Sequence, residues 1–309
     1  MASTPILSVK KLHKIYSGKI PFTAVDGISF DLGQGEILGL LGPNGSGKTT
    51  TIQMLLGTLS VTSGSILYFG KEFFHHRSEI LQSVSFASTY TSLPYILTIE
   101  ENLKVFGRLY GLSPKQALKK ADPLLERFGI FEKKKRPISS LSAGQITRLM
   151  LVKAFFTDPK IVLLDEPTAS LDPDVAREVC TFLSEERDRV GLSILFTSHK
   201  MEEVSELCDR AIFLKKGKII ADDLPENLAK SVSTHRLRLV IVDGLKRTEA
   251  LAKAQGLKYA IELRSITFSL DEKEIPPFLG ELMRLGVSYS HIQIEEPSLE
   301  DYFLQIAEK

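Results

Sequence analysis

The opening part of the chain alternates short apolar runs with turn residues, a pattern that predicts strands. Residues Ile37–Leu41 are almost all apolar, as expected for a strand buried on both faces of a sheet. Positions such as Asp26-Gly27 mark the turns between runs. The further strand candidates are Ile6–Val9, Ile28–Leu32, Gly64–Gly70, Ile161–Leu164 and Ile194–Thr197. The chain is therefore expected to fold in the α/β class around a parallel sheet.

Helical spacing interrupts this pattern between residues 98 and 158. Thr98, with Glu101 three residues later, forms a capping-box pattern that predicts a helix start. Ser113-Pro114 predicts a second start, because serine caps helices and proline suits the first helical position. Pro123 lies inside the apolar stripe of that second helix, so we expect a break or kink there. The sequence therefore predicts a mostly helical subdomain.

The composition changes near Pro225, and the remainder predicts a second domain. Its elements follow the order β-α-β-β-α-β, typical of a small ferredoxin-like layer, with one terminal helix added. The expected strands and helices are, in order, Arg236–Asp243, Lys246–Gln255, Leu257–Leu263, Ile266–Leu270, Glu274–Leu285, Val287–Ile294 and Ser298–Ile306. We therefore predict domains at residues 1–225 and 226–309, the second an accessory α+β domain.

Composition narrows the class of protein without naming an activity. A chain of 309 residues, 43% hydrophobic and 25% charged, is typical of a globular protein. The net charge of +1 gives no reason to expect a nucleic-acid partner. Cys180 and Cys208 form no CxxC pattern, which predicts two buried, reduced thiols. The start lacks a signal peptide and no apolar run is long enough to cross a bilayer, so we expect another chain to supply any membrane part.

A phosphate-binding loop follows the apolar strand Ile37–Leu41. Residues 42–50 satisfy the pattern GxxxxGK[ST], in which glycines let backbone N–H groups turn toward phosphates. Lys48 is expected to contact the β- and γ-phosphates, and the Thr49 hydroxyl to ligate Mg²⁺. The predicted nucleotide-binding residues of the loop are Gly42, Pro43, Asn44, Gly45, Ser46, Gly47, Lys48, Thr49 and Thr50.

Two carboxylates end the apolar run Ile161–Leu164. Asp165 is placed to hold Mg²⁺ through a water molecule. Glu166 is the candidate general base for the water that attacks the γ-phosphate. On their own these acids could cap a helix instead, but beside a phosphate loop the catalytic interpretation is favoured.

Between loop and acids, Leu141-Ser142-Ala143-Gly144-Gln145 is similar to the signature LSGGQ of the ATP-binding cassette (ABC) family. The chain resembles that family from Ile6 to Ala221, which implies a P-loop NTPase fold with an antiparallel β subdomain and a helical subdomain. The resemblance also implies a dimer that sandwiches ATP, because Ser142, Gly144 and Gln145 would bind a nucleotide held by the opposite subunit. Ala143 replaces the usual first glycine.

The same resemblance assigns roles to further residues. His199 stands where the family carries its switch histidine, which contacts the γ-phosphate. Tyr16 stands where an aromatic ring stacks on adenine, although it could equally pack on the sheet edge. Ser170–Asp172 resembles the dimer-contacting loop, and Arg148 is expected to order the signature helix. Thr89 replaces a glutamine that contacts Mg²⁺, so we expect contact through a water, altered coupling and lower basal hydrolysis.

The segment Glu296–Phe303 resembles the C-terminal extension of ATPases from bacterial ABC-2-type exporters. That resemblance implies an ATP-binding, ATP-hydrolysing subunit that uses ATP and Mg²⁺. It would drive export through a separate transmembrane permease subunit, as a homodimer or heterodimer, peripheral on the cytoplasmic face of the membrane. The alternatives are a non-transport cassette ATPase acting on ribosomes or DNA, and a regulatory cassette with weak hydrolysis. The transported substrate stays open.

Overall fold

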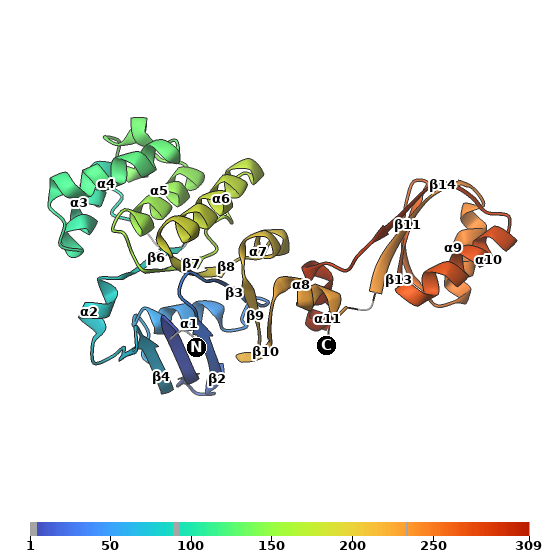
Figure 1. The fold of residues 1–309 in the computed structure, drawn as a ribbon, viewed down its shortest axis with the longest axis horizontal. Coiled ribbons are helices and arrows are strands. Elements are labelled where there is room, and N and C mark those ends of the chain that lie inside the picture. Colours follow the sequence, from blue (N-terminus) through green and yellow to red (C-terminus); the bar gives the residue numbers. More distant parts are fainter. Residues whose placement is uncertain (1–4, 89–92, 233, 309) are drawn as a thin grey trace. The chain divides into compact units, whose positions relative to one another are not determined.

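The computed structural model describes residues 5–88, 93–232 and 234–308. The chain divides into two compact units, Met1–Pro225 and Glu226–Lys309, and each is considered by itself. Within the described ranges, no helix combines the length and the apolar character that crossing a bilayer requires. Figure 1 shows the elements of both units along the chain.

The core of the first unit is a six-stranded sheet in the order β10-β9-β3-β8-β7-β6. The strands β3, β6, β7, β8 and β9 pair in parallel, and β10 is antiparallel to β9. Every residue of β3, β7 and β8 is buried, as the apolar runs predicted. The bounds are β3 Ile37–Leu41, β6 Val84–Ser88, β7 Ile161–Asp165, β8 Ser193–Thr197, β9 Arg210–Lys215 and β10 Lys218–Asp223.

A second, antiparallel sheet of the first unit has the order β2-β1-β4-β5. Its strands are β1 Leu7–Tyr16, β2 Phe22–Leu32, β4 Ser63–Tyr68 and β5 Lys71–Glu72. The strands β1 and β2 are longer than predicted, because their pairing continues through several register shifts that interrupt the alternation of apolar residues. One buried apolar cluster joins this sheet to the core sheet and to helix α1, Lys48–Leu55.

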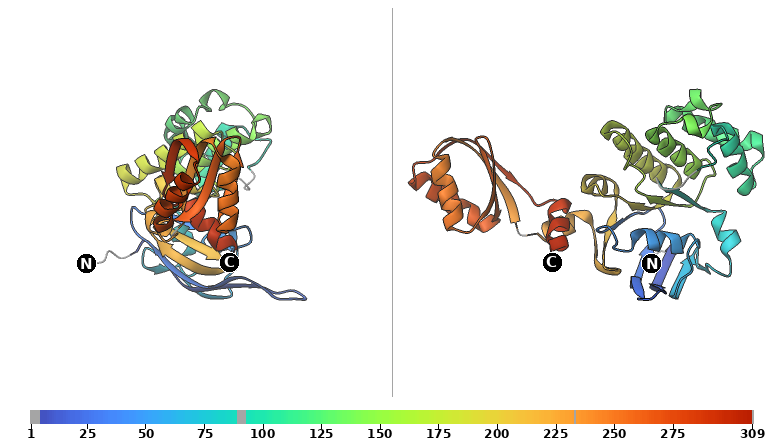
Figure 2. Two further views of the ribbon diagram at one scale, coloured as in Figure 1. Left: turned by 90° about the vertical axis from the view of Figure 1, so that its right-hand side faces the viewer. Right: turned by 180° about the vertical axis from the view of Figure 1, so that it is seen from behind.

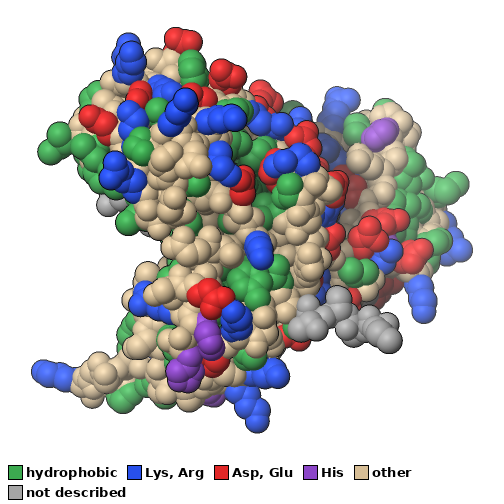
Figure 3. Space-filling view, turned by 60° about the vertical axis from the view of Figure 1, so that its left-hand side comes forward, with side chains coloured by type: hydrophobic (Ala, Val, Ile, Leu, Met, Phe, Trp, Pro, Cys, Tyr) green, Lys and Arg blue, Asp and Glu red, His purple; other side chains and the backbone are tan. Residues whose placement is uncertain are grey.

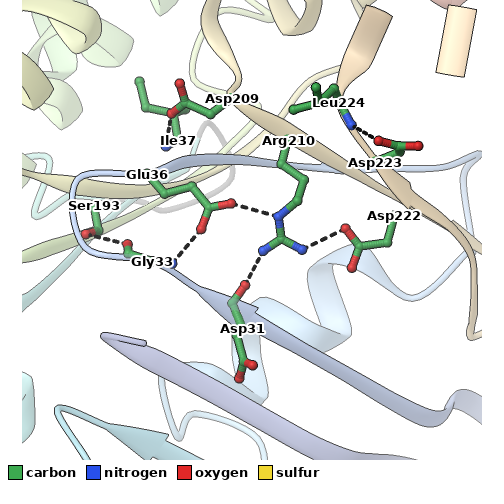
Figure 4. Close-up of polar contacts among 10 residues, drawn as sticks. All are labelled: Asp31, Gly33, Glu36, Ile37, Ser193, Asp209, Arg210, Asp222, Asp223 and Leu224. Atoms are coloured by element: carbon green, nitrogen blue, oxygen red, sulfur yellow. Dashed lines mark hydrogen bonds and ion pairs between the residues drawn. The ribbon is translucent and has the colours of Figure 1, made fainter. Parts of the chain in front are cut away.

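Arg210 connects the two sheets through charged and polar contacts (Figure 4). Its guanidinium donates from Nε to Glu36 at 2.8 Å and from one terminal nitrogen to Asp222 at 2.7 Å. The other terminal nitrogen donates to the backbone carbonyl of Asp31 on β2. These contacts fix the turn that leads into β3, the strand that precedes the phosphate loop.

Helices gather on one side of the core sheet (Figure 1). The capping boxes at Thr98 and Ser113 are confirmed, and they begin α3, Ile99–Leu109, and α4, Pro114–Arg127. The expected break at Pro123 does not occur, since α4 continues past it. Pro123 lies on the exposed side of α4, where water can satisfy the backbone carbonyl that loses its partner.

The first unit contains further helices and two short 3₁₀ turns. The helices are α2 Arg77–Leu81, α5 Ala143–Phe155, α6 Pro173–Val190 and α7 Met201–Leu207, with short 3₁₀ turns η1 Phe131–Lys133 and η2 Ile138–Ser140. Cys180 and Cys208 are both free and buried, as predicted.

The second unit is a four-stranded antiparallel sheet in the order β12-β13-β11-β14. This is the strand order of a ferredoxin-like layer, and one apolar cluster joins its strands to α9 and α10. Each bound lies within two residues of the prediction: β11 Thr234–Asp243, α9 Leu245–Ala254, β12 Lys258–Glu262, β13 Ser265–Asp271, α10 Ile275–Arg284, β14 Ser288–Glu295 and α11 Leu299–Glu308. The 3₁₀ turn η3, Glu272–Glu274, precedes α10.

The terminal helix α11 does not lie on the ferredoxin-like layer with α9 and α10. Figures 1 and 2 both show α11 beside α8, Pro225–Lys230. Leu228 and Leu299 are buried, and Arg236 on β11 forms an ion pair with Asp301 on α11.

Candidate active site

The phosphate loop connects β3 to α1 and is pressed against neighbouring strands. The backbone φ is +144° at Gly42 and +109° at Gly47, values that residues with a side chain rarely adopt. A Cβ at Gly42 would lie 2.2 Å from the Leu214 carbonyl oxygen, and one at Gly47 would lie 2.6 Å from the Ala24 carbonyl oxygen. The chain itself therefore requires glycine at both positions.

The side chain of Lys48 lies folded along this loop. Its Nζ donates hydrogen bonds to the carbonyl oxygens of Gly42 at 2.7 Å and Pro43 at 3.2 Å, and the residue is 6% exposed. Burial lowers the pKa of Lys48, and the nearby carboxylates of Glu166 and Asp165 act against that shift. The ammonium group is thus already held at the loop, where a phosphate would replace its backbone partners.

Oxygen atoms suited to Mg²⁺ lie at the edge of the loop. The Thr49 hydroxyl lies 3.4 Å from Oδ2 of Asp165, and the Thr197 hydroxyl donates to Oδ1 of Asp165 at 2.9 Å. Asp165 is 2% exposed, at the end of β7. Carboxylate and hydroxyl oxygens are the ligands that Mg²⁺ prefers, so this pair fits a magnesium–phosphate complex. The contact from Thr197 was not predicted, because it depends on β7 and β8 lying side by side.

Glu166 follows Asp165 in a left-handed backbone conformation, with φ +53°. Its amide donates to the Thr197 hydroxyl at 2.9 Å and to the Thr197 carbonyl at 3.2 Å, which holds this strained conformation. Oε1 of Glu166 lies 2.5 Å from Nε2 of His199. The structure therefore brings together the two residues to which the sequence assigned catalysis, with Glu166 11% and His199 46% exposed.

A cavity of about 660 Å³ contains most of these groups. Tyr16 lies in its wall with loop residues Asn44–Thr50, Asp165 and Glu166. Phe22, the register partner of Tyr16 across β1 and β2, lines the same cavity and was not singled out from the sequence. The volume lies in the usual range for a small-molecule site. A cavity of about 700 Å³ lies near the opposite ends of β7 and β8, around Lys160 and Leu192, and none of the predicted site residues lines it.

The signature residues do not line the nucleotide-sized cavity. Ser142 caps α5 and forms a capping box with Gln145: the Ser142 amide donates to Oε1 of Gln145 at 3.1 Å, and the Gln145 amide donates to the Ser142 hydroxyl at 3.4 Å. A Cβ at Gly144 would lie 3.5 Å from the Ser170 carbonyl oxygen, an ordinary contact. The signature thus lies beside the predicted dimer-contacting loop of its own chain.

Two other predictions concern residues near the signature and the sheet. Arg148 donates to the Phe128 carbonyl at 3.2 Å, and this contact joins α5 to the end of α4. That contact agrees with a role in ordering the signature helix. Thr89 lies outside the described residues.

Comparisons with known proteins agree with this arrangement. The family model described as ABC transporter matches residues 25–169. The linearmycin resistance ATP-binding protein LnrL of Bacillus subtilis (strain 168) is 31% identical over 308 residues, which cover 97% of this chain and 98% of that protein. The Nod factor export ATP-binding protein I of Ralstonia nicotianae is 36% identical over 243 residues, covering 79% of this chain and 73% of that protein.

A solved structure described as the ATP binding subunit of an ABC transporter has a TM-score of 0.67 at 26% identity. The match covers 73% of this chain and 92% of the chain in that structure. This solved structure, the matching family model and the relative matched over nearly its whole length together establish the fold and the family of this chain. This chain is an ATPase that belongs to the ABC transporter family, as one of its ATP-binding subunits.

Proposed function

We propose that two copies of the chain close around two ATP molecules and that closure drives export through a separate membrane subunit. The observation that carries this proposal is the separation of the site into two parts within one chain. The phosphate loop, Asp165 and Glu166 line one cavity, whereas the signature residues lie outside it. Exposed Ser142 at the start of α5 is therefore available to a nucleotide on a second copy.

In this proposal each residue of the phosphate-loop half has one role. The backbone amides of residues 42–50 and the Lys48 ammonium bind the phosphates. Thr49 would ligate Mg²⁺ and Asp165 would hold it through a water molecule, and the bound ion would neutralise part of the phosphate charge. Tyr16 stacks on the adenine, and Phe22 is close enough on the same cavity wall to extend that apolar surface.

The proposed hydrolytic pair is Glu166 and His199. In this proposal the Glu166 carboxylate accepts a proton from the attacking water, and the bonds to Thr197 hold its backbone at φ +53°. Nε2 of His199 lies 2.5 Å from that carboxylate, and its N–H can donate either to Glu166 or, once ATP is bound, to the γ-phosphate. Ser142, Gly144 and Gln145 of the second copy complete the site.

The helical subdomain offers a surface for the membrane subunit. Tyr95 and Ile96, 54% and 91% exposed, lie directly before α3. Their segment is fixed by backbone bonds from Ile138 to Leu97 at 3.0 Å and from Ser139 to Tyr95 at 3.1 Å. Figure 3 shows many Lys and Arg side chains on the helical lobe at the top of that view, with Asp and Glu side chains among them. Exposed apolar side chains beside basic ones support protein docking at this lobe.

Export as the direction of transport is supported by the names of the relatives, one a resistance protein and the other an export protein. We place the chain on the cytoplasmic face of the membrane and assign residues 226–309 to an accessory domain. The net charge of +1 offers no support for the alternative of a ribosome- or DNA-bound ATPase.

The test is extraction of the tagged protein from its native membranes in mild detergent, followed by mass spectrometry of the copurifying proteins. A stoichiometric polytopic membrane protein is the expected result. Recovery with ribosomal or DNA-repair proteins, and without a membrane partner, would reject the transport role.

A further inference from the structure

A buried carboxylate connects two loops of the proposed site, and no motif in the sequence pointed to it. Glu203 lies in the first turn of α7, and its side chain is 10% exposed. Its Oε2 accepts hydrogen bonds from the Thr168 hydroxyl at 2.6 Å and from the Ser198 hydroxyl at 2.8 Å. Its Oε1 lies 3.0 Å from Nζ of Lys200. One oxygen atom therefore links hydroxyl groups from two different loops.

Each hydroxyl group belongs to a segment that carries a proposed hydrolytic residue. Thr168 is two residues past Glu166, and its carbonyl accepts from the Leu171 amide at 3.2 Å, at the start of the predicted dimer-contacting loop. Ser198 directly precedes His199. Thr168 is 1% and Ser198 4% exposed, so water cannot readily replace the missing partner if the carboxylate is removed.

His199 depends on such a link because packing holds it weakly. Nearly half of its side chain, 46%, is exposed, so apart from the contact with Glu166 the packing restricts the imidazole little. Its position is set by the backbone of residues 197 to 199. Thr197 bonds to the end of β7, and Ser198 bonds through Glu203 to the loop after β7. The second of these links lies next to His199.

We propose that Glu203 is a positioning residue for ATP hydrolysis. Its carboxylate holds the loop of Glu166 and the loop of His199 together, so that the imidazole meets the base. This proposal rests on the roles given above to Glu166 and His199. A carboxylate suits the task, because hydrogen bonds to a charged acceptor are stronger than those between neutral groups. Lys200 compensates part of the buried charge.

We call the link from Glu203 to Thr168 and Ser198 the bridge. Steady-state ATP hydrolysis, with kcat and KM measured separately, tests it. Glu203→Met removes the acceptor at similar side-chain length, and we expect kcat to fall about tenfold. KM for ATP should stay within about twofold, because Glu203 does not line the nucleotide cavity. Glu203→Gln keeps an oxygen that can accept both hydroxyls and should restore most of the rate. The exposed neighbour Glu202 supplies the matched control, Glu202→Gln, with unchanged kinetics.

A double-mutant cycle on the two hydroxyls tests the same bridge without altering the carboxylate. Ser198→Ala and Thr168→Val should each lower kcat several-fold. The combined variant should be no slower than the more damaged single variant, because either change breaks the same link. Three results would overturn the proposal. The losses in kcat of the two single variants could multiply in the combined variant, or the loss could lie entirely in KM. The Glu203→Gln variant could also be as slow as Glu203→Met.

Glu166→Gln, measured alongside, separates failure of the bridge from failure of the proposed site. If Glu166→Gln hydrolyses ATP at the normal rate, the assignment of the base is wrong and the proposed function of this site fails. If Glu166→Gln is inactive while Glu203→Met is unaffected, the proposed site stands and only the bridge is rejected.

Discussion

The phosphate loop and the signature segment both contain glycine at the start of a helix, but the chain constrains them differently. At Gly42 and Gly47 an added Cβ would lie within 2.6 Å of a backbone oxygen, and both have positive φ. At Gly144 the nearest atom would be 3.5 Å away, and φ is not positive. The phosphate loop is therefore shaped by its own chain. The chain places no such steric demand on Gly144, which fits the close approach of a nucleotide on a second copy.

This difference predicts that substitutions in the two segments impair ATP hydrolysis in different ways. Changes in the phosphate-loop half should impair an isolated chain, because in the proposed scheme ATP binds there before the two copies close. Changes in the signature should leave ATP binding by the isolated chain intact and impair only the closed pair. The following variants test that separation, beginning with the largest expected effect.

Glu166→Gln should reduce kcat about a thousandfold while leaving ATP affinity nearly unchanged, because the amide cannot accept the proton of the attacking water. Because hydrolysis is blocked, the two copies should stay closed around the bound ATP. Single-turnover hydrolysis and sedimentation in saturating ATP measure the two effects. A variant that stayed monomeric in saturating ATP would remove the main support for the sandwich.

Gly47→Ala should weaken ATP binding by the isolated chain about a hundredfold or more, because the new methyl group meets the Ala24 carbonyl oxygen at a φ of +109°. Gly45→Ala is the matched control. Gly45 also has a positive φ, +76°, but nothing lies within 4 Å of its added Cβ. Titration calorimetry should give a much smaller loss for this control. Equal losses would show that backbone strain, and not the close approach of β2, decides the effect.

Gly144→Ala should lower hydrolysis by about tenfold without changing ATP affinity in the isolated chain, since the methyl group would be added to the segment that the proposal assigns to the nucleotide of the second copy. Alanine also favours helix over glycine by up to about 1 kcal/mol, so the variant should unfold at no lower urea concentration than the wild type. Urea denaturation and nucleotide titration at low protein concentration check both parts. A weaker affinity in the monomer would place Gly144 in the binding site of its own chain.

The smallest expected effect concerns Lys153, the half-buried lysine of the signature helix. Burial lowers the pKa of Lys153 to about 8, and its Nζ lies 5.1 Å from the centre of the Phe106 ring on α3. The unfolded chain keeps this proton up to about pH 10.4, so folding should gain stability as pH rises from about 8 toward that value. Lys153→Met should abolish this gain. Urea unfolding at both ends of the interval, with wild type and variant compared, measures it.

The sequence predicted well those elements in which the buried positions are occupied by apolar residues. The strands β3, β7 and β8 are buried throughout and were recognisable as apolar runs. The strand β6, Val84–Ser88, was missed because two of its buried residues are serines, Ser85 and Ser88. The strands β9 and β10 were missed because they begin and end with charged residues, which ion pairs such as Arg210–Glu36 accommodate.

The candidate site was predictable where spacing along the chain carries the chemistry. The phosphate loop was predicted from its spacing, Asp165 and Glu166 from their place after an apolar strand, and His199 from the family resemblance. Thr197, Phe22 and Glu203 were not predicted, because each lies beside a partner that only the folded chain brings close: Asp165, Tyr16 and Thr168 respectively.

A mixing experiment tests the central claim, that each site is shared between two chains, most directly. Lys48→Ala inactivates the phosphate loop. Gly144→Asp inactivates the signature, while an acidic residue in the first turn suits α5. Each variant alone should be inactive. Mixed in equal amounts, half of the dimers should contain both variants and hold one intact site, so about a quarter of wild-type ATP hydrolysis should return. A mixture as inactive as its components would contradict the shared site.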